Sequence, residues 1–497
     1  MTAKKPVKEN YSYESFVEDS VKWENNPLYG WCNKNFKPDG SPYDLYRDGL
    51  KIYSTLNYNM QRYAEESVDE HLKGLQKEFN AEKKGRKTAP FSEDLNKKDI
   101  DNIMYNSLVR TERYYDLRAR GLTRDSIMRI FNTPVQMKLF SWEGEKDTVL
   151  TPYDSVRYYK YFLRAGFMAM EPVSGMVKAY VGGHNFKYFK YDQVTQGKRQ
   201  VGSTVKPFLY TLAMQEGDRP CDMAPNVQVT FPVIIDGRDT TWSPRNSGNF
   251  DMEGKWVTLK WGLAHSVNYI SAYLIKKYNP QAVVDIMKKM GITSKVDPVP
   301  SVIYGTSDIS LYEMVAAFNT FTDKGVYVEP QFVTRIEDKN GNVLAVFQPS
   351  KVEAISEPTA YLMVKLLQGV VNRGTASRLR WFFKFTGEMG GKTGTTQNQS
   401  DGWYLGITPK LTAGAWVGAE DRSVHFDALA KGAGGYTALP IWGNFFRKVY
   451  ADTSLHFTQE EVFTPPIDFN VRLNCTDYEG DNLSPEIIIP NGNYDEF

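Results

Sequence analysis

The sequence predicts a mixed α/β (α+β) protein built on one five-stranded antiparallel sheet flanked by helices. Three observations support this prediction. Two short apolar runs at 166–171 and 176–181 form one group, and three more at 389–396, 402–407 and 411–418 form a second group. Helical patterns dominate the long interval between the two groups. A hairpin, then helices, then a meander is typical of a layered domain with helices packed on a sheet.

The first two runs are joined by residues 172–175, which begin with Pro172 and end with Gly175. Proline and glycine at such a junction specify a tight reversal of the chain, so the pair is predicted to be a β-hairpin. Downstream, Thr408-Pro409-Lys410 turns the fourth run into the fifth. Short links of this kind join neighbouring antiparallel strands.

Three helical patterns occupy the interval. The segment 258–278 places apolar residues near helical spacing. A second pattern begins at Asp308 and ends near Gly325. The third begins at Ser356, an N-cap residue followed by proline in the first turn, and stops at Gly374.

The N-terminal part of the chain has a different character. Polar residues fill 1–48, a strand-like run covers 50–56, and a helical pattern dense in Glu, Lys and Leu covers 60–79. The charged segment 80–100 is predicted to be an exposed loop, and 100–161 is helical in propensity and rich in Tyr and Arg. The predicted organisation is an arm at 1–48, a main domain at 49–83 and 161–452, an insert of unknown role at 84–160, and a tail at 453–497.

Composition restricts the possible functions. The 60 Lys and Arg residues nearly balance the 59 Asp and Glu residues, so the net charge is +1, whereas a whole-chain nucleic-acid binder normally shows a basic surplus. Mean hydropathy is -0.47, and no run approaches 18 apolar residues, so no helix is expected to span a bilayer. The basic N-terminus leads into polar sequence and lacks the pattern of a signal peptide. The three cysteines contain no C-x-x-C pair, so neither a disulfide framework nor a cysteine zinc site is expected.

The first chemical motif is Ser-x-x-Lys, formed by Ser203 and Lys206. Pro207 belongs in the first turn of a helix, which predicts that the helix begins near Ser203. Residues three apart on a helix share a face, so Lys206 should lie one turn from the Ser203 hydroxyl. This is the arrangement of a nucleophile with an adjacent base.

The second motif is Lys-Thr-Gly at 392–394, within a glycine-rich predicted strand. Glycine inside a strand often marks the close approach of a ligand or of another backbone. Alternation along the strand puts Thr393 and Thr395 on one face and Lys392 on the other. We therefore expect the two hydroxyls to touch a ligand carboxylate, with Lys392 adding positive charge from beneath.

The third motif is Ser-x-Asn at 266–268. A second copy at 247–249 lies in a polar stretch with proline and is predicted to be a turn. Ser266 and Asn268 fall in an otherwise amphipathic helical segment. Serine and asparagine are unfavourable there, which suggests that they have a function. Periodicity does not decide whether the helix is interrupted there. The three motifs in this order form the set found in serine β-lactamases and penicillin-binding proteins, although Val267 stands where that set has Asp.

The chain resembles the transpeptidase domain of class A penicillin-binding proteins from about Gly49 to Tyr450. Beyond the three motifs, the resemblance includes an entry strand, a basic lead-in to the serine motif, a middle helix and the strand after it. These segments are 49–56, 196–200, 310–314 and 325–330. The resemblance implies a β-lactamase/transpeptidase-like fold in which 49–83 and 161–452 form the penicillin-binding transpeptidase domain.

Two features depart from the class A pattern. The aromatic insert around 84–160 is not in the general pattern. Class A members also carry a membrane helix and a glycosyltransferase domain, and the nearest acidic pair here, Glu18-Asp19, lacks the neighbouring residues of that domain. The expectation is an expressed fragment, or a form that relies on another anchor.

The resemblance implies a role for each site residue. Ser203 would attack the penultimate D-alanine of a peptidoglycan stem peptide while neutral Lys206 takes its proton, and nearby Lys392 would lower the pKa of Lys206. Ser266 would pass the proton to the leaving D-alanine, and Asn268 would hold Lys206 and the donor peptide. The backbone N–H groups of Ser203 and Thr395 would form the oxyanion hole. The residues implied to hold the terminal carboxylate and line its site are Lys392, Thr393, Gly394 and Thr395.

The resemblance also implies the setting of the reaction. No metal or organic cofactor is needed, and β-lactam antibiotics would acylate Ser203 in place of the donor peptide. The implied location is the extracytoplasmic (periplasmic) face of the bacterial cytoplasmic membrane, with the anchor absent from this chain and with cell-wall synthesis proteins as possible partners. Three alternatives remain open: a D,D-carboxypeptidase, a β-lactamase-type hydrolase, and a non-catalytic β-lactam sensor module. His265 next to Ser266 is expected to pack or to lie at the surface rather than to act as a base.

Overall fold

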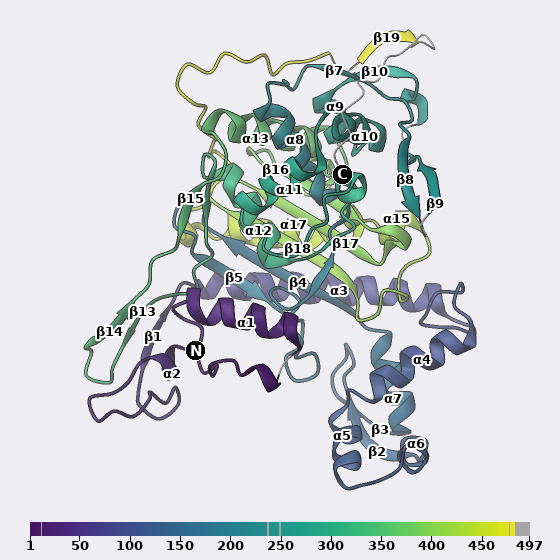
Figure 1. Ribbon diagram of the computed structural model, residues 1–497, viewed down its shortest axis with the longest axis vertical. Helices are drawn as coiled ribbons and strands as arrows, with labels where there is room; N and C mark the ends of the chain where they lie inside the picture. Colours follow the sequence, from purple (N-terminus) through teal and green to yellow (C-terminus); the bar gives the residue numbers. More distant parts are fainter. Residues whose placement is uncertain (11, 236–237, 248–249, 477, 483–497) are drawn as a thin grey trace.

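The computed structural model describes residues 1–10, 12–235, 238–247, 250–476 and 478–482. Its centre is the predicted five-stranded sheet, in the order β16-β17-β18-β4-β5 with every neighbouring pair antiparallel (Figure 1). The strands are β4 (Leu163–Met170), β5 (Val177–Val181), β16 (Gly390–Thr395), β17 (Asp401–Ile407) and β18 (Thr412–Ala419). The hairpin and the meander predicted from the sequence are thus confirmed, and β4 pairs with β18 to join them.

Helices cover both faces of this sheet. On one side, α3 (Tyr58–Lys83) contacts β4 and β5, and α17 (Leu439–Ala451) contacts β17 and β18. On the other side, α12 (Leu311–Thr322) and α13 (Glu357–Asn372) contact the sheet and each other (Figure 1). Every residue of β4, β17 and β18 is buried, which explains why these strands are apolar on both faces.

Further helices pack beyond α13 and carry two of the three motifs. The helical segment at 258–278, whose continuity at Ser266 the periodicity left open, is two helices, α9 (Leu259–Ala264) and α10 (Asn268–Lys277). The others are α8 (Lys206–Gln215), α11 (Pro280–Lys289) and the short α14 (Arg378–Trp381). Small two- and three-stranded sheets surround this layer: β6 (Lys198–Gln200) with β11 (Asp308–Ser310), β8 (Phe231–Ile235) with β9 (Arg238–Trp242), β12 (Val326–Val328) with β15 (Lys351–Glu353), and β7 (Met223–Pro225) with β10 (Lys255–Thr258) and β19 (Tyr478–Asn482).

The N-terminal arm has more structure than its polar composition suggested. It contains α1 (Tyr13–Asn25) and α2 (Trp31–Lys34), and the strand expected at 50–56 is β1 (Lys51–Ser54). This strand pairs with β13 (Val333–Glu337), which also pairs with β14 (Val343–Val346). Trp31 and Cys32 are buried against Ile336, so a small apolar cluster anchors the arm to this sheet.

The insert forms a lobe below the main body (Figure 1). Its helices are α4 (Lys97–Leu108), α5 (Glu112–Ala119), α6 (Arg124–Phe131) and α7 (Pro152–Lys160). The expectation of helix throughout was wrong at β2 (Val135–Leu139) and β3 (Lys146–Leu150), which pair as a hairpin. Val135, Met137 and Leu139 alternate with polar residues, which is the period of a half-buried strand.

The prediction of a solvated loop at 80–100 was wrong at its start. Helix α3 continues to Lys83, whose side chain is fully buried and whose Nζ lies 2.8 Å from Asp427 Oδ1. Pro90 and Phe91 are also buried. Charged residues are rarely fully buried unless they are paired with an opposite charge. The partner of Lys83 lies more than 300 residues away in the sequence, so the local sequence does not reveal the pairing.

The expectation of no disulfide was also wrong, because Cys221 and Cys475 are bonded across a sequence separation of 254 residues. Cys32 is the free and buried third cysteine. An odd count and the absence of C-x-x-C spacing cannot exclude a pair that only the tertiary fold brings together. The bond ties the tail to the segment between α8 and β7.

Limited trypsin digestion should detect this bond. Arg472 is exposed, and cleavage after it produces a C-terminal peptide of 25 residues. We expect this peptide to stay attached through Cys475 under non-reducing conditions and to be released when a reductant is added, as followed by mass spectrometry. The Cys475→Ser variant should release it without reductant. Release from the untreated parent protein would contradict the pairing.

Candidate active site

The Ser-x-x-Lys motif lies at the start of α8. Residues Gly202–Val205 form a 3₁₀ turn that leads directly into the helix, with Pro207 in its first turn. Ser203 is half-buried, whereas Lys206 is fully buried. The helix thus begins where proline predicted, and the serine precedes the lysine by about one turn.

The Ser-x-Asn motif occupies the break between α9 and α10. Ser266 has a φ of 57°, a left-handed conformation that a residue other than glycine rarely adopts. The turn directs both oxygens of this serine at Lys206: the Nζ atom lies 2.6 Å from the Ser266 carbonyl oxygen and 3.3 Å from its Oγ. Asn268 begins α10, and its Oδ1 accepts a hydrogen bond from the same Nζ at 2.7 Å.

The Lys-Thr-Gly motif lies on β16, the edge strand of the central sheet. Lys392 is fully buried, and its Nζ donates to Ser266 Oγ and to the Thr393 carbonyl oxygen, both at 2.9 Å. The structure therefore brings the three motifs together around Ser266, which contacts both lysines.

Glycine allows β16 to approach the serine turn closely. A Cβ atom added to Gly394 would lie 2.7 Å from the Val201 carbonyl oxygen, and one added to Gly202 would lie 2.7 Å from the Thr395 carbonyl oxygen. Gly202 also has a positive φ of 53°. Larger residues at either position would separate the strand from the turn that carries Ser203.

The threonine hydroxyls already have partners within the chain. Thr393 Oγ1 lies 2.7 Å from Thr375 Oγ1, and Thr395 Oγ1 accepts a hydrogen bond from the Gly434 backbone N–H at 3.0 Å. Thr375 was missed by the sequence analysis. It follows α13 outside any motif, and only the fold brings its backbone N–H to the Ala264 carbonyl oxygen and its hydroxyl to Thr393.

The other expectation near the site concerned His265. Its ring stacks on Trp261 with centroids 4.4 Å apart, and Nδ1 lies 3.1 Å from the Trp261 carbonyl oxygen. The side chain thus packs against the preceding turn of α9, in keeping with the packing role predicted for it.

Burial and proximity change the ionisation of both lysines. Burial, and then the positive charge of Lys392, hold the pKa of Lys206 well below its usual value. Burial alone lowers the pKa of Lys392 to about 7. Two ammonium groups that share one hydroxyl in a buried site repel each other, so a neutral amine is favoured at one of them near neutral pH.

The stability of the protein should therefore rise with pH. In the unfolded chain both lysines have the ordinary lysine pKa of 10.5, but in the folded protein they release their protons at lower pH. Between about pH 7 and 10.5 the unfolded state binds more protons, which raises the free energy of unfolding by ~1.4 kcal/mol per pH unit for each neutral lysine. Urea denaturation at pH 7, 8 and 9 measures how the free energy of unfolding changes with pH. This increase per pH unit should be smaller for Lys392→Met than for the parent. Equal slopes would contradict the lowered pKa of Lys392.

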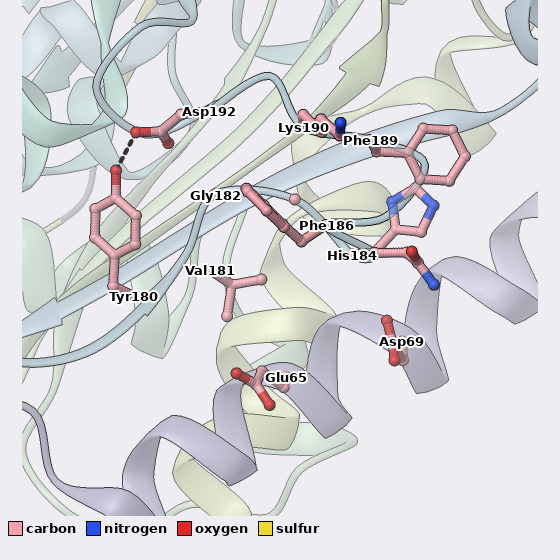
Figure 2. A pocket seen from close by; sticks show the side chains of 12 residues that line it. Glu65, Asp69, Tyr180, Val181, Gly182, His184, Phe186, Phe189, Lys190 and Asp192 are labelled. Atoms are coloured by element: carbon pink, nitrogen blue, oxygen red, sulfur yellow. Dashed lines mark hydrogen bonds between the residues drawn. The ribbon is translucent and has the colours of Figure 1, made fainter. Parts of the chain in front are cut away.

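A separate cavity of about 480 Å³ lies at the opposite edge of the sheet (Figure 2). It is lined by α3, the end of β5 and the loop that follows, and it includes Glu65, Asp69 and His184. None of the three motifs contributes to this cavity. Among the described residues, no cluster of three or more potential ligand side chains could hold a metal ion, and no helix is both long and apolar enough to cross a membrane.

Comparison with known protein families agrees with this geometry. Residues 165–450 match the penicillin binding protein transpeptidase domain, and residues 86–163 match the penicillin-binding protein middle domain. The first match covers more than half of the chain. The protein therefore belongs to the penicillin-binding protein transpeptidase family. The second match coincides with most of the segment described above as an insert.

Individual relatives are more distant. The chain is 27% identical to penicillin-binding protein 1A of Aquifex aeolicus, a match that covers 87% of this chain and 57% of the relative. It is 28% identical to penicillin-binding protein 2D of Bacillus subtilis, over 76% of this chain and 52% of the relative. The chain thus spans little more than half the length of these relatives.

Solved structures share the fold. Penicillin-binding protein 1A of Haemophilus influenzae superposes with a TM-score of 0.62 at 17% identity, covering 92% of this chain and 76% of that one. The PonA1 protein of Mycobacterium tuberculosis, in complex with penicillin V, superposes with a TM-score of 0.56 at 20% identity, covering 93% and 97%. The sheet and its helices are therefore those of penicillin-binding proteins.

Proposed function

We propose that this protein is a D,D-transpeptidase that cross-links peptidoglycan stem peptides through an acyl-enzyme on Ser203. The observation that carries the proposal is the buried amine of Lys206, which follows Ser203 by one turn and is held by Ser266 and Asn268. A buried lysine with a lowered pKa is an effective general base near neutral pH.

The contacts of Lys206 suit a neutral base. A neutral amine has two N–H groups and one lone pair. The Ser266 carbonyl oxygen and Asn268 Oδ1 accept the two N–H groups at 2.6 and 2.7 Å. The lone pair then remains for a hydroxyl, either that of Ser266 or that of Ser203. Lys206 can thus take the Ser203 proton as Oγ attacks the carbonyl carbon.

The remaining residues have complementary roles in the proposal. Lys392, donating to Ser266 Oγ, orients that hydroxyl so that it can pass the proton from Lys206 to the amine of the leaving D-alanine. The backbone N–H groups of Ser203 and Thr395 stabilise the oxyanion. Thr393, Gly394 and Thr395 line the site of the terminal carboxylate, and Thr375 joins them through its contact with Thr393.

The second half-reaction regenerates the serine. The amine of a second stem peptide attacks the acyl carbon, a new peptide bond forms, and Ser203 Oγ recovers its proton. A β-lactam follows the first half alone: its ring opens on Ser203, nothing leaves, and the adduct retains the whole antibiotic. A protein of the same fold, PonA1, has been solved in complex with penicillin V, which supports binding of a β-lactam by this chain.

The location proposed for this activity is the extracytoplasmic face of the bacterial cytoplasmic membrane, where its substrate lies. The Cys221–Cys475 disulfide supports this location, because disulfides persist in oxidising compartments and are rare in the cytosol. The relatives named above are bacterial proteins.

Two measurements test the function. After treatment with benzylpenicillin, the intact protein should gain the full mass of the antibiotic, and peptide mapping should place the adduct on Ser203. With a stem peptide and an acceptor amine, the protein should form the cross-linked dimer. Release of D-alanine without a dimer would instead identify a carboxypeptidase, rapid turnover of the antibiotic would identify a β-lactamase, and a stable adduct without peptide turnover would identify a sensor.

A further inference from the structure

Four residues hold the four polar groups of Asn268. Its Oδ1 accepts from Lys206 Nζ, and its Nδ2 donates to the Arg245 carbonyl oxygen at 2.7 Å. Its backbone carbonyl accepts a hydrogen bond from the Tyr304 hydroxyl at 3.3 Å, and its backbone N–H donates to Asn246 Oδ1 at 2.9 Å. The amide therefore has one favoured orientation, with the oxygen toward the lysine.

Asn246 caps α10 from a separate segment of the chain. The N-cap residue of this helix is Val267, which has no side-chain oxygen and makes no capping hydrogen bond. Asn246 Oδ1 instead accepts from the backbone N–H groups of both Asn268 and Tyr269, the latter at 3.2 Å. The first N–H groups of a helix have no partner within the helix, so this side chain supplies what the local sequence lacks.

The other end of the Asn246 amide is also fixed. Its Nδ2 donates to Glu253 Oε1 at 2.9 Å and lies 3.4 Å from Asn226 Oδ1. Asn226 is fully buried and is bound through its own Nδ2 to the Met252 carbonyl oxygen at 2.7 Å. Asn246 itself is only 8% exposed. A buried amide with all its hydrogen bonds made is held in one orientation, and through Oδ1 it fixes the backbone at the start of α10.

We propose that Asn246 is a positioning residue, which holds the start of α10 so that Asn268 presents its side-chain oxygen to Lys206. The proposal rests on the function proposed above for Lys206. Asn246 contacts neither Ser203 nor Lys206 by any hydrogen bond described for the chain, so its effect passes through Asn268. Its loss would leave two helix N–H groups without their partner and would release the backbone that carries the Asn268 side chain.

The direct test compares the kinetics of acylation by benzylpenicillin. For Asn246→Ala we expect the limiting acylation rate constant to fall about 10- to 100-fold, the loss typical of a small displacement of catalytic groups. The dissociation constant of the non-covalent complex should change less than about 3-fold, because Asn246 does not face the antibiotic. If Asn246 only stabilised the fold, its loss would lower the amplitude of labelling, because the amplitude counts folded molecules. The rate constant of acylation would then stay unchanged.

Two matched variants separate positioning from capping in general. Asn279→Ala removes the side-chain cap of α11, another helix of the same domain, and should leave the acylation rate constant unchanged. Asn246→Asp combined with Glu253→Gln keeps an acceptor toward α10 and reverses the hydrogen bond to position 253, so it should acylate within about 3-fold of the parent, a bound set by the retained geometry. If Asn246→Ala does not fold, Asn246→Ser replaces it in the comparison.

A parent-like rate constant in Asn246→Ala, or a double variant as slow as Asn246→Ala, would overturn the proposal. Failure of the cross-linking reaction alone would leave acylation by penicillin, and hence this comparison, intact. Failure of the acyl-enzyme itself gives a different result, since the parent protein would then not be acylated at all. In that case crystal structures of the parent and of Asn246→Ala decide the point. Retention of the 2.7 Å contact between Asn268 Oδ1 and Lys206 Nζ in the variant would refute positioning by Asn246, and its loss would support it.

Discussion

The Ser203→Ala variant should show no covalent labelling by a fluorescent penicillin. Without the Ser203 Oγ atom no acyl bond can form, so we expect the rate of labelling to fall by at least about 1,000-fold. The substitution removes one oxygen from a half-buried side chain, so the free energy of unfolding should stay within about 1 kcal/mol of the parent. Gel fluorescence and urea denaturation measure the two quantities.

The matched control is Ser54→Ala, which removes a hydroxyl from an exposed position on β1. This variant should be labelled as fast as the parent. Undiminished labelling of Ser203→Ala would show that another residue is the nucleophile and would refute the assignment of the site.

The Lys206→Met variant should keep its fold and lose most of its acylation rate. Methionine has a similar length and no amine, so it can neither take the Ser203 proton nor share the hydroxyl of Ser266. General-base catalysis contributes typically 10²–10⁴-fold, and we expect a loss of about that size. Stopped-flow measurement of acylation over a range of penicillin concentrations separates this effect from weaker binding.

Lys83→Met is the control for replacing a buried lysine. Lys83 is as fully buried as Lys206, but it is paired with Asp427 and belongs to none of the three motifs. Its loss should cost stability, on the order of 1–3 kcal/mol, and leave the acylation rate constant unchanged. If Lys206→Met acylated at the parent rate, the general base would have to be another residue.

Much of the fold could be predicted from the sequence. Strands β4, β17 and β18 are buried on both faces, so their apolar runs are easily found, and Pro172 with Gly175 marked the hairpin. Pro207 located the start of α8 for the same local reason. The motif residues were found because each motif has a short, fixed spacing along the chain.

The features that were missed depend on contacts between distant segments. The periodicity left the continuity of the helix at Ser266 open, and the break there, with a φ of 57°, directs the serine oxygens to Lys206, which is 60 residues away in the sequence. Thr375 reaches Thr393 only after α13 has packed against β16, and Asn246 reaches Asn268 from a loop that local propensity describes as a turn. The burial of Lys83 was missed for the same reason, because its partner Asp427 is distant in the sequence.

The covalent tie between positions 221 and 475 affects how the protein is prepared. Recombinant material made in a reducing cytoplasm would emerge with both thiols unoxidised, two hydrogen atoms heavier than the tied form and with its terminal segment untethered. Different preparations would then contain the reduced and the disulfide-bonded protein in different proportions. A free-thiol titration before each kinetic experiment would show which species is being measured.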